Sequence, residues 1–259
     1  MSHYIVAVLH SPEQDVTELL APYDENMQVE PYIGRTKEDM IRDGKKRAQR
    51  CKEDVSKGYS RYMTPYLTAK TDEDFYNAER DDEFCEYDDD GNELSTYNPK
   101  SKWDWYSIGG RWGGTLKVRP TEENGFADYL YEEDDEFVYL DSAPIKDIDF
   151  SRDEETYARC YDWWVNNIDN EPEEWNHLYK KEYYEEMYED AEDYANQCAS
   201  FSTFAVVTPD GEWHELGEMG WFGCSNETPE EARAWHDNYM NLIHSVPEDY
   251  YMTIVDCHI

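Results

Sequence analysis

Short apolar runs predict strands near both ends of the chain. Every position from Tyr4 to Leu9 is apolar, which is typical of a strand covered on both faces. Further apolar runs occupy 204–208 and 250–255, and Pro209-Asp210-Gly211 predicts a turn into a strand at 212–214. We therefore expect an α+β fold, with one mixed or antiparallel sheet formed by strands near both termini and helices packed on it.

Capping signals predict the starts of the helices. Thr36 can cap a helix in which apolar residues recur at helical spacing as far as position 55. Ser151 and Glu154 have the spacing of a capping box that opens a helix to about 168, and a further helix is expected from 172 to about 197. The run from Thr228 to Glu231 combines a cap, a proline and a capping-box Glu, and the helix that follows should reach about His244.

Asp88-Asp89-Asp90-Gly91 has the composition of a calcium loop, but its register does not fit one. With Gly91 at the invariant glycine position, the twelfth position is Tyr97, where a bidentate Glu is required. A β-hairpin with a tight turn at Asp90-Gly91 or Gly91-Asn92 is the better interpretation. A further strand is expected at 114–118.

The distribution of acidic residues suggests how the chain is organised. Ten Asp or Glu lie between Glu171 and Asp193, with tyrosines among them, and twelve lie in residues 71–93. We predict an α+β core formed by residues 1–120 and 201–259, into which an acidic, largely helical segment of residues 121–200 is inserted.

The composition indicates a folded protein with an acidic surface. The 259 residues carry a formal net charge of −38, and 15% of them are aromatic, which disordered chains are not. Such a surface repels nucleic acid and anionic membranes, and it attracts basic proteins and divalent cations. Solubility or adaptation to high salt would explain the same composition without any specific partner.

One segment is basic. Residues 35–61 hold ten Lys or Arg against five Asp or Glu. We expect this helix to dock on the protein's own acidic surface or on a neighbouring subunit, so self-association is open. Binding to a phosphate group or an RNA backbone is the alternative.

Cysteine usage and hydropathy point to the cytoplasm. None of the six cysteines forms a C-x-x-C pair, so neither a disulfide framework nor a cysteine-based zinc site is expected. No targeting segment and no apolar run of membrane-spanning length is visible. We predict no resident cofactor, no metal and no membrane association.

The run from Lys102 to Gly114 is the most distinctive motif. Its glycines permit positive φ angles, its aromatic residues offer stacking surfaces, and its arginine offers a planar fork for a carboxylate or phosphate. The motif therefore predicts a pocket for an anionic or nucleotide-like ligand, although its glycine spacing matches neither a P-loop nor a dinucleotide fingerprint. A structural bend with the tryptophans in the core is an equally good explanation. The candidate ligand-binding residues are Trp103, Asp104, Trp105, Tyr106, Arg111 and Trp112.

Two other segments carry candidate chemistry. The glycine-rich loop 217–223 would complete an aromatic cleft if it lay beside the first motif. In the C-terminal Asp256-Cys257-His258, an extended strand puts Asp256 and His258 on one face and Cys257 on the other. Asp and His can act as a base pair or bind a metal, with His3 as a second ligand only if the first and last strands are neighbours. Terminal residues are more often passive.

These motifs support a family resemblance. The W-D-W-Y-x-I-G-G-R-W run of Trp103–Trp112, the opening H-Y-I-V-A-V-L, L-A-P-Y-D-E-N at Leu20–Asn26, the G-E-M-G-W-F-G loop and the closing D-C-H-I resemble a group of uncharacterised tailed-bacteriophage proteins. The resemblance implies a phage gene expressed in the cytoplasm of a bacterial host. It implies no catalytic residue, and the acidic stretches at 71–93 and 121–200 depart from its pattern.

Two functions remain open at this point. The first is a non-enzymatic phage accessory protein that binds a basic host protein, for example a counter-defence inhibitor that imitates the phosphate array of nucleic acid. The second is a protein, either a sponge or an enzyme, that binds a small anionic ligand or nucleotide at the Trp/Gly/Arg motif. The predicted partner-binding carboxylates are Glu182, Glu185, Glu186, Glu189, Asp190 and Asp193.

Overall fold

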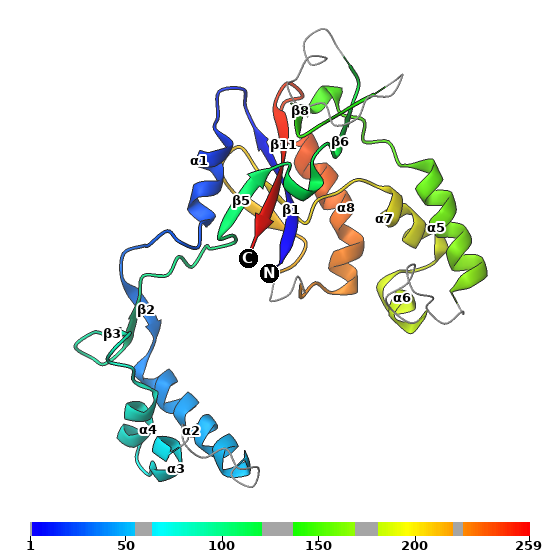
Figure 1. Cartoon of the computed structure of the whole chain (residues 1–259). Helices are drawn as coiled ribbons and strands as arrows, with labels where there is room; N and C mark the ends of the chain where they lie inside the picture. Colours follow the sequence, from blue (N-terminus) through cyan, green and yellow to red (C-terminus); the bar gives the residue numbers. More distant parts are fainter. Residues whose placement is uncertain (1, 55–63, 121–136, 169–180, 220–224) are drawn as a thin grey trace. The chain divides into compact units, whose positions relative to one another are not determined.

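The computed structural model describes residues 2–54, 64–120, 137–168, 181–219 and 225–259 (Figure 1). The chain divides into two compact units, residues 1–25 with 100–259, and residues 26–99. These units do not coincide with the division predicted from the sequence, because residues 26–99 form a unit of their own. Residues 137–168 and 181–200 belong to the same unit as both termini.

The larger unit is built on a mixed sheet whose two longest strands come from the two chain ends. Strands β1 (His3–His10) and β11 (Tyr251–His258) pair antiparallel over eight residues each, from His3 opposite His258 to His10 opposite Tyr251. The strand order is β10-β9-β1-β11-β5, and β8 also pairs with β11. The predicted α+β fold with a sheet formed from both termini is confirmed. The remaining strands are β5 (Trp105–Ile108), β8 (Ser142–Pro144), β9 (Ala205–Val207) and β10 (Trp213–Glu215).

Both faces of this sheet are covered, as the apolar run of β1 predicts. Ala7 and Leu9 pack in one buried cluster with side chains of α8 (Pro229–His244). Val6 and Val8 pack in a second cluster with side chains of α1 (Val16–Leu20). The sheet therefore lies between two layers of apolar side chains, which is why it can bury its central strands completely.

The helix α8 begins where the sequence predicts. Thr228 caps it, and its hydroxyl accepts from Glu231 N while the Glu231 carboxylate accepts from Thr228 N, at 3.3 and 2.7 Å. The buried side chains of Trp235, Tyr239 and Ile243 recur at helical spacing and face the sheet.

A helical layer and a small sheet complete the larger unit. The strands β6 (Leu116–Val118) and β7 (Val138–Leu140) pair antiparallel and join the cluster under α8. We call α5 (Glu154–Asn167), α6 (Lys181–Met187) and α7 (Ala191–Ala199) the acidic helix layer. They differ from the prediction in two ways: Asp153 rather than Ser151 caps α5, and Asp190 interrupts the single helix expected as far as 197. Residues 172–180 of that helix lie outside the described residues.

The smaller unit combines a three-stranded sheet with helices. The sheet order is β2-β4-β3, and β3 and β4 form the predicted hairpin around Gly91, which has φ +86°. The turn takes five residues rather than two, because the Asp88 carboxylate accepts hydrogen bonds from the backbone of Asp90 and Asn92. The pKa of the Asp88 carboxyl is lowered, mainly by the hydrogen bond from the Asn92 side chain and further by these backbone hydrogen bonds. The elements are β2 (Tyr32–Arg35), α2 (Lys37–Asp54), α3 (Thr64–Thr68), α4 (Asp72–Glu79), β3 (Glu86–Tyr87) and β4 (Glu93–Ser95).

The basic helix α2 docks on acidic residues of its own unit. Lys45 Nζ lies 2.6 Å from Asp72 Oδ1, and Arg47 Nε lies 3.4 Å from Glu79 Oε1. Arg35, just before the helix, reaches the same Glu79 at 2.9 Å. Neutralisation within the chain, one of the two arrangements expected for this helix, is therefore what the structure shows. In the described part of the chain, no helix is long and apolar enough to cross a membrane.

Truncating a buried side chain of β11 tests the central packing. Ile254 is fully buried, whereas Ile108 on the neighbouring β5 is 53% exposed. We expect Ile254→Ala to lower the free energy of unfolding by ~2–5 kcal/mol, because it leaves a cavity. The matched variant Ile108→Ala should change it by less than about 0.5 kcal/mol. Chemical denaturation followed by circular dichroism measures both, and equal losses would contradict the described burial.

Candidate functional sites

The Trp/Gly/Arg motif divides between the core and the surface. Trp103 is buried, and its Nε1 donates to Leu20 O at 3.3 Å. Tyr106 packs edge-on against Trp103, and Trp112 is half-buried against the other cluster. For Trp103, Tyr106 and Trp112, the motif is therefore a structural bend that places aromatic side chains against the core. Trp105, which is 45% exposed, and Arg111 remain at the surface, and Asp104 is partly exposed.

The two chain ends and β5 bring together two His–Asp pairs, which we call the terminal His–Asp cluster. His3 Nδ1 lies 2.8 Å from Asp256 Oδ1, and His258 Nδ1 lies 2.6 Å from Asp104 Oδ1. The two imidazole rings meet edge to face with centroids 4.9 Å apart. The side chain of His3 is 10% exposed, that of Asp256 2% and that of His258 7%. The sequence predicts that His3 lies beside the C-terminal Asp256 and His258 only if the first and last strands are neighbours. The strands β1 and β11 are neighbours.

The hydrogen bonds to the carboxylates show which nitrogen of each imidazole ring carries a hydrogen. A carboxylate accepts hydrogen bonds, so each Nδ1 that contacts one carries the hydrogen, and in the neutral ring Nε2 then has the lone pair. His258 Nε2 is buried and has no hydrogen-bond partner among the described residues. His10, in the same sheet, has both ring nitrogens within 2.9 Å of a partner oxygen. His258 therefore differs from His10, whose two ring nitrogens are both hydrogen-bonded inside the protein.

Trp105 covers the cluster. Its ring stacks on His258 with centroids 5.3 Å apart and an interplanar angle of 18°, and it meets His3 edge-on at 5.3 Å. The Asp104 carboxylate holds His258 rather than Arg111. Within the described residues the Arg111 guanidinium makes no ion pair, and only its backbone N donates to Asp256 Oδ2, at 3.0 Å.

The glycines of the motif are explained by this cluster. Gly109 and Gly110 have φ angles of +67° and +54°. A Cβ at Gly110 would overlap the Asp256 side chain, and one at Gly109 would overlap Asp141. Asp141 in turn accepts from Gly114 N at 2.7 Å. The glycines thus let the loop close onto two carboxylates instead of cradling a phosphate.

Cys257 lies apart from this chemistry. It alternates with Asp256 and His258 along β11 and points into the cluster under α1, where it is fully buried. Burial raises the pKa of the thiol, with a further contribution from Asp256. The thiol form is thereby favoured, and a thiol is a much weaker nucleophile and metal ligand than a thiolate.

The predicted partner-binding carboxylates lie in the acidic helix layer. Glu182, Glu185 and Glu186 are exposed on α6, and Glu189 and Asp190 are exposed in the connection to α7. Asp190 caps α7 by accepting from the backbone of Glu192 and Asp193 at 2.9 and 3.0 Å. Asp193 is half-buried and accepts from Glu189 N at 2.9 Å. Two of the six carboxylates therefore also stabilise the helix start.

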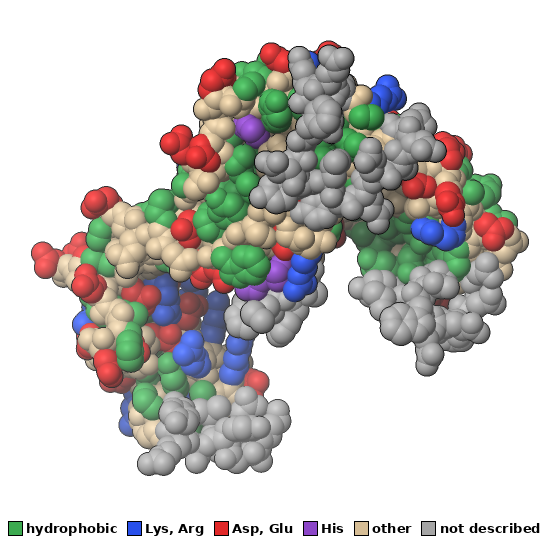
Figure 2. All heavy atoms as spheres, turned by 45° about the horizontal axis from the view of Figure 1, so that its top comes forward, with side chains coloured by type: hydrophobic (Ala, Val, Ile, Leu, Met, Phe, Trp, Pro, Cys, Tyr) green, Lys and Arg blue, Asp and Glu red, His purple; other side chains and the backbone are tan. Residues whose placement is uncertain are grey.

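Three tyrosines of this layer pack inside it, whereas Tyr161 and Tyr183 are exposed. Tyr184 and Tyr194 pack against Trp163 with ring centroids 5.0 and 5.3 Å apart, and Tyr188 packs against Tyr194 at 5.0 Å. Burial raises the pKa of the Tyr188 and Tyr194 phenols. These three rings form part of the interior of the layer. On the face seen in Figure 2, Asp and Glu side chains are spread widely over the surface.

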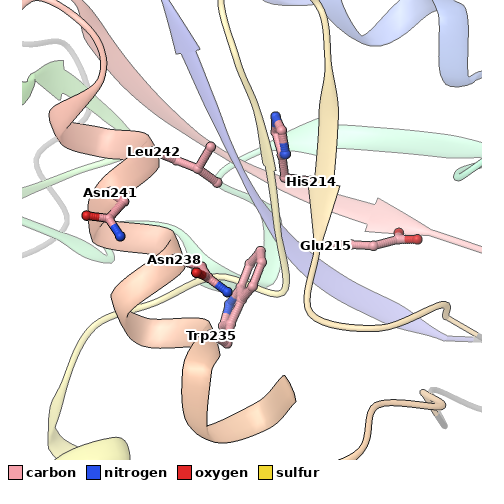
Figure 3. A pocket seen from close by; sticks show the side chains of 6 residues that line it. All are labelled: His214, Glu215, Trp235, Asn238, Asn241 and Leu242. Atoms are coloured by element: carbon pink, nitrogen blue, oxygen red, sulfur yellow. The ribbon is translucent and has the colours of Figure 1, made fainter. Parts of the chain in front are cut away.

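A hollow between β10 and α8 was not predicted. It has a volume of about 460 Å³, and Figure 3 shows His214 and Glu215 on the strand and Trp235, Asn238, Asn241 and Leu242 on the helix. The Glu215 carboxylate is already held by Lys102 Nζ at 2.6 Å and by Trp213 Nε1 at 2.8 Å. The Trp235 indole donates to Thr203 O. Asn residues on a helix gave no signal in the sequence that could have revealed this hollow.

The second glycine-rich loop cannot be placed beside the first motif, because residues 220–224 lie outside the described residues. Comparisons with protein-family models, with curated proteins and with solved structures found no match.

Replacing Gly110 tests the loop that closes the cluster. Gly211 is a matched control, because its φ is +82° and nothing lies within 4 Å of an added Cβ. We expect Gly211→Ala to lower the free energy of unfolding by ~1–2 kcal/mol through backbone strain alone. Gly110→Ala should lower the free energy of unfolding by a further ~1–3 kcal/mol, because the added Cβ overlaps the Asp256 side chain. Denaturant titration measures both losses, and a loss no larger than that of the control would contradict the close approach.

Proposed function

We propose that this chain is a non-enzymatic phage accessory protein that binds a basic host protein through the acidic helix layer, in the cytoplasm of the bacterial host. The carboxylates would take the place of nucleic-acid phosphates, as in a counter-defence inhibitor. The observation that carries the proposal is an excess of exposed carboxylates on helices held together by an aromatic interior.

The charge balance of the layer supports this proposal. Residues 151–168 and 181–200 hold eleven Asp or Glu against three Lys or Arg. Of the predicted set, Glu185 pairs with Lys181 at 3.4 Å, whereas Glu182, Glu186 and Glu189 make no ion pair with the described residues. Unpaired exposed carboxylates attract a basic surface at long range and speed encounter with it.

The arrangement on helices suits an extended array of charges. Residues three or four positions apart on a helix have Cβ atoms about 5–6 Å apart. Each strand of duplex DNA carries one charge per about 3.4 Å of axis, a spacing of the same order. Packing of Tyr184, Tyr188 and Tyr194 against tryptophans of α5 stabilises this spacing, because the helices cannot separate without exposing the rings.

The smaller unit supports the choice of surface. There the basic residues of α2 already pair with carboxylates of α4, as Lys45 does with Asp72. A partner that binds beside α2 would have to displace these pairs, whereas the acidic helix layer offers carboxylates that no described Lys or Arg occupies.

The alternative function, binding of a small anionic ligand at Trp105 and Arg111, receives less support. Three carboxylates, those of Asp104, Asp141 and Asp256, lie in or beside the terminal His–Asp cluster. Their charge opposes an anion and favours a cation.

Charge reversal tests the proposed surface. We expect the Lys variant at Glu182, Glu185, Glu186 and Glu189 to lose the host protein that the wild-type chain captures from bacterial lysate, because attraction becomes repulsion. The captured protein should be released between about 0.1 and 1 M salt, as screening shortens the reach of charge from about 10 to about 3 Å. A duplex DNA oligonucleotide should compete for it.

The matched control reverses four exposed carboxylates of the smaller unit, Glu83, Glu86, Asp89 and Asp90, and so changes the net charge equally. Capture should survive this change. Equal loss in both variants would show that only the net charge matters, and unchanged capture in the first variant would contradict the proposal.

A further inference from the structure

His3 and His258 form a cross-strand pair at the end of the sheet. They are directly opposite in the antiparallel register of β1 and β11. Side chains directly opposite on such a pair of strands share a face, with Cβ atoms about 4.5–5.5 Å apart. The 4.9 Å between the ring centroids agrees with this placement.

Each ring is held in the form that a metal ion requires. Metal-binding histidines donate their other ring N–H to a carboxylate or carbonyl, which fixes the tautomer and the orientation of the ring. Asp256 takes this position for His3 and Asp104 takes it for His258. Two Nε2 lone pairs remain, and that of His258 is buried without a partner among the described residues. A buried polar atom without a partner costs free energy that a bound ion would recover.

The surroundings select a cation. The two Asp carboxylates lie at hydrogen-bond distance from the rings, and Asp141 lies beside the same loop. Imidazole nitrogen binds zinc, copper and nickel in preference to magnesium and calcium, which take oxygen ligands. Zn–N bonds are about 2.0–2.1 Å long, so two nitrogens on one ion lie about 3–3.5 Å apart. Ring centroids 4.9 Å apart are close enough for both imidazoles to bind one ion.

We propose that the terminal His–Asp cluster is a binding site for a divalent ion of the zinc type, with His3 and His258 as ligands and Asp256 and Asp104 as the carboxylates that orient them. Among the described residues no group of three or more His, Cys, Asp and Glu side chains is arranged to enclose an ion. The protein thus supplies two ligands, and water or an exogenous ligand fills the other positions. This site is separate from the acidic helix layer and does not depend on its function.

Trp105 gives the site a cover and a spectroscopic signal. Its indole contacts both imidazole rings, so it limits the access of water to them. A paramagnetic ion such as Ni²⁺ or Cu²⁺ bound there should quench its fluorescence, and Trp105→Phe should remove that part of the signal.

Calorimetric titration of the full chain with Zn²⁺ in millimolar Mg²⁺ tests the site. The Mg²⁺ occupies surface carboxylates, which an acidic protein offers in number. We expect one Zn²⁺ per chain. His3→Asn and His258→Asn should each weaken Zn²⁺ binding at least about tenfold. Removing only the carboxylate that orients a metal-binding His already weakens metal binding by about tenfold or more. Asn can still donate to the Asp carboxylate, so these variants remove Nε2 while keeping the hydrogen bond.

His214→Asn is the matched control, because His214 lies on β10 outside the cluster. It should bind Zn²⁺ as the wild type does, and circular dichroism verifies that every variant is folded. If His3→Asn does not fold, His258→Asn decides the outcome. No Zn²⁺ binding in Mg²⁺, or binding that folded His variants retain in full, would overturn the proposal and leave only adventitious binding to surface carboxylates.

Discussion

The antiparallel pairing of β1 with β11 is the constraint on which the rest of the larger unit depends. It joins the two ends of the chain over eight residues each and places β9 and β5 on the two outer sides of this pair. Because side chains alternate along a strand, a slip of one residue would exchange the buried clusters on the two faces. The same slip would separate His3 from His258. Core packing and the candidate metal site therefore depend on one register.

Charge is distributed differently in the two units. Around α2 in the smaller unit, opposite charges lie close together and pair, and surface pairs of this kind contribute little to stability, ~0–1 kcal/mol each. In the acidic helix layer, the carboxylates outnumber the available cations and remain exposed, while aromatic rings supply the packing. In the terminal cluster, the carboxylates are paired with imidazoles. Carboxylates thus neutralise basic residues in the smaller unit, form an exposed acidic surface on the acidic helix layer, and orient imidazole rings in the terminal His–Asp cluster.

Much of the fold could be predicted from the sequence, because local signals and burial agree. The apolar run of β1, the capping box at Thr228 and the turn at Gly91 each have one physical explanation, and each element is present. The break at Asp190 was missed because the periodicity continues through it, and only the hydrogen bonds of its carboxylate show a new helix start. The separate unit of residues 26–99 was missed because composition does not report which contacts are long-range.

The candidate site could be predicted in part. Alternation along the last strand placed Asp256 and His258 on one face, and His3 was named as a partner conditional on neighbouring strands. The roles of Asp104 and the glycines could not be predicted, since they depend on β5 pairing with the far side of β11. The burial of Tyr184, Tyr188 and Tyr194 inside the acidic helix layer could not be predicted, because tyrosine occurs both in interfaces and in cores and its sequence spacing does not distinguish the two.

The central claim is that the terminal strands hold two histidines with Nδ1 on a carboxylate and Nε2 available. Long-range ¹H–¹⁵N correlation spectra of the imidazole rings measure the tautomer of each of the seven histidines directly. The account predicts the Nδ1–H tautomer for His3 and His258 near neutral pH, and a change of their Nε2 shifts when Zn²⁺ is added. An Nε2–H tautomer at both rings, or Zn²⁺-induced shifts spread evenly over all histidines, would contradict it.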